Sequence, residues 1–133
     1  METMIKSSVA TQTLNMPWEE EYGYAQAVKK GNTVWLSGQL GHNEKGILAV
    51  GMEEQLKQTY RNAKKLLEGF GMSLDNVVEE VLYVLDMKTA FEARKTFGRQ
   101  FYTNCKQVAS TIAVVNGLAI PSQLIEIKFV AVN

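Results

Sequence analysis

Hydrophobic and polar residues first form a regular pattern between Tyr22 and Ser37. The stretch "YGYAQAVKKGNTVWLS" contains two apolar runs, rich in β-branched and aromatic residues, separated by Lys30-Gly31-Asn32. Runs of this kind around a glycine-containing turn are typical of a β-hairpin. The following "GQLGHNEKGILAVG" has four glycines and no helical period, so it predicts a loop, with a short strand allowed at residues 47–50.

Two segments in the middle of the chain have helical spacing. In the first, apolar residues recur every three or four positions, acidic residues precede basic ones, and Gly69 and Gly71 mark the end. The second begins with Thr89 as its predicted N-cap residue. The predicted buried faces are Leu56, Tyr60, Ala63, Leu67 and Phe70 in the first helix, and Ala90, Ala93, Phe97 and Phe101 in the second.

Three further strands complete the pattern. Residues 77–85, "VVEEVLYVL", are apolar and β-rich, which suits a strand buried on much of both faces. After the second helix, "VASTIAVV" predicts a short strand that begins with the small side chains Ala109, Ser110 and Thr111. A turn at Gly117 and Pro121 leads into a last strand, "QLIEIKFVAV".

The order of these elements predicts the fold class. Two strands, a loop, and then helix, strand, helix, strand, strand favour an α+β protein with one sheet and two helices on a single face. A length of 133 residues is typical of one domain, so residues 1–133 are predicted to form a single domain.

The last strand indicates what the other face of the sheet contacts. Side chains of a strand alternate between the two faces of a sheet. This alternation places Ile125 and every second residue after it under the helices, and Glu126, Lys128 and Val130 on the opposite side. That opposite side is too apolar for open water and too charged for a core, so it predicts an interface between subunits arranged around an axis. Desolvation there would raise the pKa of Glu126, although a surface glutamate paired with a lysine fits the sequence equally well.

Composition narrows the functional classes. Acidic and basic residues balance at 14 each, so no long-range field attracts nucleic acid or an anionic membrane. Cys105 is the only cysteine, which excludes an internal disulfide and favours a reducing compartment, with Cys105 as a small buried residue. No N-terminal signal pattern and no membrane-length apolar run are present, so a cytoplasmic protein is predicted.

The only histidine, His42, lies in the glycine-rich loop. Without a second histidine or a nucleophile motif nearby, it is interpreted as a surface loop residue, and no metal site is predicted. Ribonuclease chemistry needs an acid, a base and a cationic phosphate site, which a neutral chain with one histidine does not supply.

Taken together, these segments resemble a known family. "YGYAQAV", "GNTVWLSGQLG", "NAKKLLEGFGMSLDNVV", "VASTIAVV" and "LIEIKFVAV" occur in the order found in the reactive intermediate deaminases, the Rid or YjgF-like family formerly labelled endoribonuclease L-PSP. The resemblance covers residues from about Tyr22 to Val132. It implies a chorismate-mutase-like fold assembled as a homotrimer, with ligand clefts between subunits.

The resemblance also implies a chemistry and a set of residues. The best understood members of this family hydrolyse 2-imino or 2-enamino acids, such as 2-aminoacrylate, to a keto acid and ammonia without a cofactor. By position, Glu126 corresponds to the carboxylate that handles the attacking water, Tyr24 to a tyrosine of the cleft, and Ser37-Gly38-Gln39 to a turn that lines it. Ala109, Ser110 and Thr111 fall on the substrate-binding strand.

One position departs from the family pattern. Where the family has an arginine that clamps the substrate carboxylate, this chain has Ala109. Hydrogen bonds to a charged group contribute on the order of 1.5–3 kcal/mol each, so binding or turnover of an α-imino acid should fall by roughly two orders of magnitude. The nearby cations Arg94, Arg99 and Lys106 are interpreted as solvated residues that do not replace the clamp.

Three functions therefore stay open. The first is an imine or enamine hydrolase with a non-standard substrate and Glu126 as its catalytic residue. The second is a non-catalytic trimeric protein that binds a small metabolite. The third, an RNA-directed activity, is least supported by the charge balance.

Overall fold

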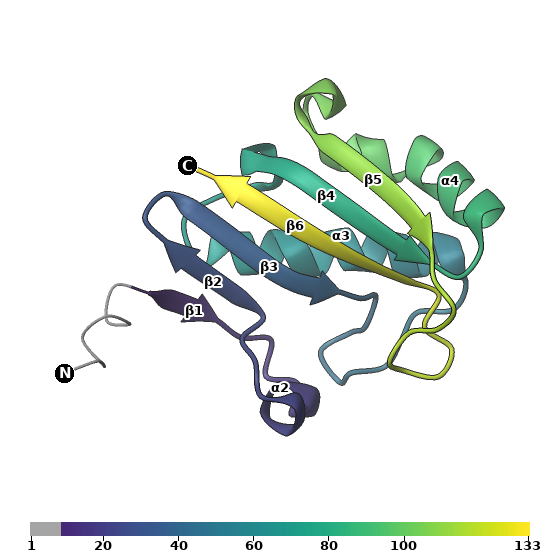
Figure 1. Cartoon of the computed structure of the whole chain (residues 1–133), viewed down its shortest axis with the longest axis horizontal. Helices are drawn as coiled ribbons and strands as arrows, with labels where there is room; N and C mark the ends of the chain where they lie inside the picture. Colours follow the sequence, from purple (N-terminus) through teal and green to yellow (C-terminus); the bar gives the residue numbers. More distant parts are fainter. Residues whose placement is uncertain (1–8) are drawn as a thin grey trace.

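The structure, a computed structural model, describes residues 9–133 and contains one mixed six-stranded sheet (Figure 1). The strands lie side by side in the order β1-β2-β3-β6-β4-β5. Their bounds are Ala10–Gln12 (β1), Ala27–Lys30 (β2), Thr33–Gln39 (β3), Val77–Val84 (β4), Ala109–Val114 (β5) and Ile125–Val132 (β6). Residues 1–8, on which the prediction about an N-terminal signal partly rests, lie outside the described residues.

The pairing of the strands follows from their connections. β2 and β3 form the predicted hairpin around Gly31, which adopts a positive φ of 61°. β4 and β5 are parallel because a helix joins them, whereas β6 runs antiparallel to both β3 and β4. The last strand of the chain therefore occupies the centre of the sheet.

Two long helices cover one face of this sheet (Figure 1). They are α3 (Met52–Glu68) and α4 (Met87–Thr96), as the helical spacing predicted. The N-cap of α4 is Asp86 and not Thr89, because the Asp86 carboxylate accepts hydrogen bonds from the amide and the hydroxyl of Thr89. Short 3₁₀ turns follow at Leu74–Asn76, Gly98–Phe101 and Cys105–Gln107.

Two elements at the N-terminal edge have no clear hydrophobic period. β1 has three residues, and the helix α2 (Pro17–Tyr22) has six, with Pro17 in its first turn. Segments this short cannot complete a recognisable period, which is why the sequence pattern did not predict them. The predicted strand at residues 47–50 is reduced to a single bridge between His42 and Leu48.

The hydrophobic core lies between the sheet and the helices. Alternate residues of β6 and the apolar stripe of α3 are fully buried there, which confirms the faces predicted for both elements. Each of the large aliphatic side chains and the phenylalanine among them contributes about 1.5–3 kcal/mol when it leaves water. The buried residues are Ile125, Ile127, Phe129 and Ala131 on β6, and Leu56, Tyr60, Ala63 and Leu67 on α3.

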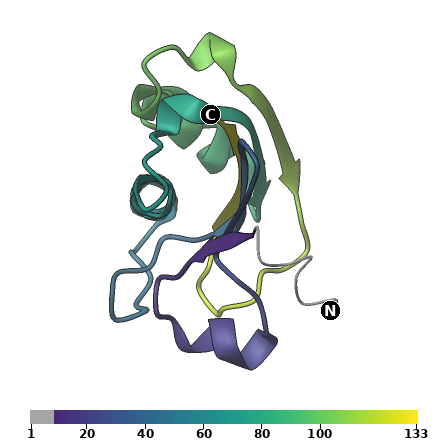
Figure 2. The same ribbon diagram turned by 90° about the vertical axis from the view of Figure 1, so that its left-hand side faces the viewer.

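The opposite face of the sheet carries no helix. Figure 2 shows the sheet nearly edge-on, with α3 and α4 on one side and the central strands bare on the other. We call this second side the open face. Among the described residues it presents Trp35, which is 41% exposed, and the partly buried Val81, Lys128 and Val130. The predicted architecture, one sheet with two long helices on one face, is confirmed.

Within residues 9–133, no helix has the length and apolar composition needed to cross a membrane.

Candidate functional site

A bulge in β3 creates the most distinctive feature of the open face. The register between β3 and β6 shifts between Leu36 and Gln39, so Ser37 and Gly38 occupy the space of one residue on β6. A Cβ atom at position 38 would collide with the carboxyl group of Glu126. Any larger residue at position 38 would displace this carboxyl group, whereas glycine lets the Glu126 side chain lie directly against the backbone of β3.

Glu126 itself is half-buried and has few partners. Its Oε1 accepts one long hydrogen bond, 3.4 Å, from Nε2 of Gln123. Burial raises the pKa of the Glu126 carboxyl above its usual value of 4.5, and this single hydrogen bond opposes the shift only partly. This direction agrees with the rise in pKa predicted for Glu126. A carboxylate with a raised pKa is a stronger base than a solvated one, and Glu126 has acceptor positions that no donor among residues 9–133 of this protomer occupies.

Tyr24 lies within electrostatic range of this carboxylate. Burial raises the pKa of its phenol, and the negative charges of Glu19 and Glu126 raise it further. The phenol oxygen lies 3.4 Å from Nε2 of Gln26, which also donates to Glu19. At neutral pH the ring therefore keeps its hydroxyl proton and can donate it in a hydrogen bond to a ligand.

A polar network holds the β3 bulge in place. The hydroxyl of Ser37 donates to the carbonyl oxygen of Ala25 at 2.7 Å. Nε2 of Gln39 donates both to the Ser37 carbonyl oxygen at 2.8 Å and to Oε1 of Gln26 at 2.9 Å. Because the Ser37 hydroxyl donates to Ala25, this side chain can offer a ligand only a hydrogen-bond acceptor, beside the backbone groups of the bulge.

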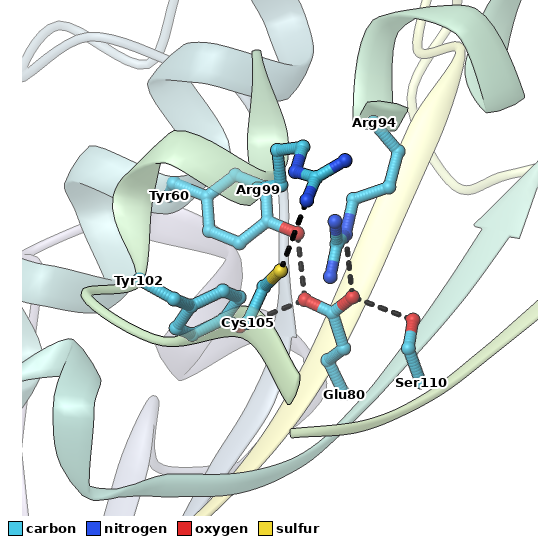
Figure 3. A network of polar contacts seen from close by, with 7 residues as sticks. All are labelled: Tyr60, Glu80, Arg94, Arg99, Tyr102, Cys105 and Ser110. Atoms are coloured by element: carbon cyan, nitrogen blue, oxygen red, sulfur yellow. Dashed lines mark hydrogen bonds and ion pairs between the residues drawn. The ribbon is translucent and has the colours of Figure 1, made fainter. Parts of the chain in front are cut away.

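The three small residues of β5 face in two directions. Ala109 and Thr111 lie on the open face, and both are exposed. Ser110 points to the helix side, where its hydroxyl donates to Oε2 of Glu80 at 2.6 Å (Figure 3). Within one protomer, Ser110 therefore does not share a face with Glu126.

The predicted site residues form two separate groups within one protomer. Ala109 is level with Glu79 on β4, whereas Glu126 is level with Tyr83, four residues further along. At about 3.3 Å per residue and 4.8 Å per strand, this separates Ala109 from Glu126 by roughly 13 Å along the strands and 10 Å across them. One protomer therefore does not bring the two groups together.

Two residues beside Glu126 were not among the predicted site residues. Gln123 donates to Glu126, a contact that depends on the turn before β6. Lys128 is half-buried on the open face, in the same row as Val81 and Thr111. The alternation of β6 had already placed Lys128 on this face, and a search for cations there would have found it.

Arg94, interpreted from the sequence as a solvated residue, is instead half-buried. Its Nε donates to Oε2 of Glu80 at 2.7 Å, and the side chain of Glu80 is fully buried (Figure 3). The hydroxyl groups of Tyr60 and Tyr102 donate to the other carboxylate oxygen at 2.6 Å and 2.7 Å. Burial, reinforced by the charge of Glu80, raises the pKa of both phenols, so both remain hydrogen-bond donors.

His42 is also buried, contrary to the interpretation as a surface residue. It is only 2% exposed, and its ring packs edge-on against Trp18 at 5.1 Å between centroids. Burial lowers the pKa of His42 below 6.5, although the contact of Nδ1 with the Asn43 carbonyl oxygen opposes this shift. The loop is tied down because Asn62 of α3 donates to the carbonyl oxygens of Leu40 and His42.

This geometry defines a class of protein: a small α+β domain with helices on one face of the sheet and a half-buried carboxylate beside a strand bulge on the other. Comparison with known proteins also identifies a family for this chain. Residues 15–133 match the family described as endoribonuclease L-PSP. A RutC family protein of Aquifex aeolicus is 32% identical over 111 residues, which are 83% of this chain and 88% of that protein.

The chain therefore belongs to the endoribonuclease L-PSP family, which also includes the YjgF, Rid and RutC proteins. A protein of Dermatophagoides farinae named 2-iminobutanoate/2-iminopropanoate deaminase is 29% identical over 93 residues, 68% of this chain and 72% of its own. A Mycobacterium tuberculosis member of the YjgF/YER057c/UK114 family shares the fold, with a TM-score of 0.84 at 22% identity. That comparison covers 95% of this chain and all of the other.

Proposed function

We propose that the chain is a small-molecule imine or enamine hydrolase that acts on a non-standard substrate in clefts between subunits. The observation that carries this proposal is the Glu126 carboxyl, which is half-buried against the β3 bulge with a raised pKa and one long hydrogen bond. The relative from Dermatophagoides farinae, named as an iminoacid deaminase, supports the same chemistry.

A homotrimer would supply the clefts. The open face exposes Trp35 together with Val81 and Val130, and an apolar surface of this kind is favourable to bury against a second copy. Because Ala109 and Glu126 are far apart within one protomer, the β5 strand of one subunit would complete the site around Glu126 of its neighbour. The family resemblance supports three such subunits, and we expect the assembly to act in the cytoplasm.

The chemistry assigned to Glu126 is proton transfer. A water molecule attacks the imine carbon and gives a proton to the carboxylate, and the carboxyl group passes this proton to the substrate nitrogen, which leaves a carbinolamine and an ionised Glu126. In the second step the carboxylate takes the hydroxyl proton of the carbinolamine and delivers it to the amine nitrogen. The C–N bond then breaks as the C=O bond forms, and ammonia and a carbonyl compound leave. A base is more effective when its pKa approaches the working pH, which the partial burial of Glu126 promotes. No cofactor takes part in these steps.

The substrate should differ from a small 2-imino acid because no arginine stands at position 109. Alanine leaves space and removes a bidentate partner for a carboxylate, so a larger or less acidic imine fits better. Lys128 lies on the open face and offers a single point charge, which suits a substrate whose acidic group is placed elsewhere. Tyr24 and the backbone of Ser37 and Gly38 would line the cleft.

The test compares hydrolysis of 2-aminoacrylate, generated in situ, by the natural chain and by Ala109→Arg, with Ala109→Met as a control for side-chain size. We expect the natural chain and Ala109→Met to be slow and Ala109→Arg to be faster by about two orders of magnitude. Adding Glu126→Gln to the arginine variant should abolish the gain. A natural chain that is already fast would show that another cation, with Lys128 as the first candidate, holds the carboxylate.

The alanine at position 109 also favours a second function. A trimer that binds a metabolite without turnover needs neither a clamp nor a base. It would be indicated if the natural chain and Ala109→Arg are both inert and Glu126→Gln changes only the affinity for a ligand. A ribonuclease activity has less support, because the only histidine is buried with a lowered pKa in a chain of zero formal net charge.

A further inference from the structure

A cavity of about 370 Å³ lies between α4 and β5, on the helix side of the sheet. It is therefore separated from the open face, and from Glu126, by the sheet itself. Its apolar wall consists of Leu82, Phe91, Val108 and Ile112. We call it the α4–β5 pocket, and nothing in the proposed function uses it.

The polar wall of this pocket is cationic. Arg94, Lys95 and Arg99 line it, and no aspartate or glutamate does. Two of these charges are already paired: Arg94 with the buried Glu80 at 2.7 Å, and Lys95 with Glu92 at 3.3 Å. The positive charge in the pocket that is not balanced by a recorded ion pair therefore comes from Arg99.

Arg99 is the cation with spare capacity. Its side chain is exposed, and among residues 9–133 no carboxylate is recorded within 4 Å of it. Its Nη2 lies 3.6 Å from Sγ of Cys105, which also lines the pocket (Figure 3). Four of the five N–H groups of Arg99 thus have no partner recorded among the described residues, and the thiol lies beside them.

We propose that the α4–β5 pocket binds a small organic acid that has an apolar body. The carboxylate of such a ligand accepts hydrogen bonds from the guanidinium of Arg99, while its hydrocarbon part packs on Phe91, Val108 and Ile112. Arg94 adds a second guanidinium, whose Nε already donates a hydrogen bond to Glu80. Apolar pockets with a few convergent polar groups are the usual form of small-molecule sites, and a planar guanidinium matches the geometry of a carboxylate.

Cys105 provides a direct readout, because it is the only cysteine of the chain and lies in the pocket. Iodoacetate and iodoacetamide both alkylate a thiol by forming an S–C bond and releasing iodide, but only iodoacetate carries a negative charge. The ratio of their rates therefore reports the affinity of the pocket for an anion. Glutathione, alkylated under the same conditions, supplies the reference ratio for a free thiol.

We expect the iodoacetate-to-iodoacetamide ratio at Cys105, measured by mass spectrometry, to exceed that of glutathione roughly fivefold or more at low salt. Arg99→Gln should return the ratio to the reference value. Lys30→Gln, which removes the same charge from an exposed residue of β2, four strands away from β5 in the sheet, should change the ratio less than about twofold. Hexanoate should slow alkylation of the natural chain, and hexanamide should not.

A ratio equal to that of glutathione, together with no protection by hexanoate, would overturn the proposal. So would a thiol that neither reagent reaches in the native assembly, because the pocket would then be closed. Arg99 is exposed in a 3₁₀ turn, so its substitution does not threaten the fold. Since Glu126 plays no part, these outcomes are independent of the deaminase test.

Discussion

Two glutamates on adjacent strands face opposite sides of the same sheet. Glu80 is fully buried on the helix side and accepts four hydrogen bonds of 2.6–2.7 Å, from Tyr60, Arg94, Tyr102 and Ser110. Glu126 is half-buried on the open face and accepts one of 3.4 Å. A carboxylate has about four strong acceptor positions, so Glu80 is saturated, whereas Glu126 is not.

This difference separates a structural carboxylate from a candidate catalytic one. A saturated carboxylate has no position left for a water molecule or a substrate, and its partners fix it in one rotamer. A partly desolvated carboxylate with few donors has a raised pKa and can exchange protons. Burial alone would have singled out Glu80, because it is the more deeply buried of the two.

The largest effect on folding is expected at the saturated glutamate. Glu80→Gln keeps the length of the side chain but leaves the half-buried Arg94 without its counter-charge. Breaking a buried ion pair in this way costs about 3–5 kcal/mol. Urea unfolding of the variant should show this loss in the free energy of unfolding.

Glu92→Gln is the matched control for this prediction, because Glu92 is an exposed glutamate paired with Lys95 on α4. It should change the free energy of unfolding by no more than about 0.5 kcal/mol. Equal effects of the two substitutions would mean that the Glu80 cluster does not stabilise the fold.

A smaller effect is expected from two neighbouring residues of β5 that face opposite sides. Ser110→Ala removes one hydrogen bond to Glu80 and should cost about 1 kcal/mol, because three other donors remain. Thr111→Val, on the exposed open face, should stay within about 0.5 kcal/mol. If the two changes cost the same in urea unfolding, the contrast between the two faces of β5 does not hold.

The smallest effect is a pH dependence at Glu126. Because burial raises the pKa of its carboxyl above 4.5, the folded protein holds this proton more tightly than the unfolded chain does. The stabilisation from this group is therefore full below the unfolded pKa and is lost as the pH rises through the folded pKa. At pH 7, Glu126→Gln should be at least as stable as the natural chain.

This advantage of Glu126→Gln should disappear when urea unfolding is repeated at pH 4. A variant that is clearly less stable than the natural chain at pH 7 would show that the ionised carboxylate stabilises the fold. Glu126 would then be comparable to Glu80, and the contrast between the two glutamates would fail.

Much of the fold was predictable because its signals are local. The hairpin around Gly31, the stripe of α3 and the alternation of β6 each depend on residues within one element, so their faces follow from periodicity. The resemblance and the alternation together also singled out Glu126 and the segment Ser37-Gly38-Gln39, although the turn expected at this segment is instead a bulge within β3. The helix α2 and the strand β1 were missed because three to six residues carry too little periodic information.

The errors share a different cause. Arg94 was interpreted as solvated and His42 as a surface residue, because charged and loop residues are usually exposed. Their burial depends on partners far away in the sequence: Glu80, 14 positions before Arg94, and Asn62, 20 positions after His42.

The sequence by itself determined that Glu126 and Lys128 share the face opposite to Ile125 and Ile127, because a strand alternates its side chains whatever surrounds it. Only the tertiary structure decided which glutamate is saturated. The four donors to Glu80 lie 14 to 30 residues away from it along the chain. Three of them belong to α3, α4 and β5, and the fourth, Tyr102, follows the 3₁₀ turn at Gly98–Phe101. Hydrogen bonding is short-ranged in space but not along the chain, so the chemical state of a carboxylate is a property of the assembled fold.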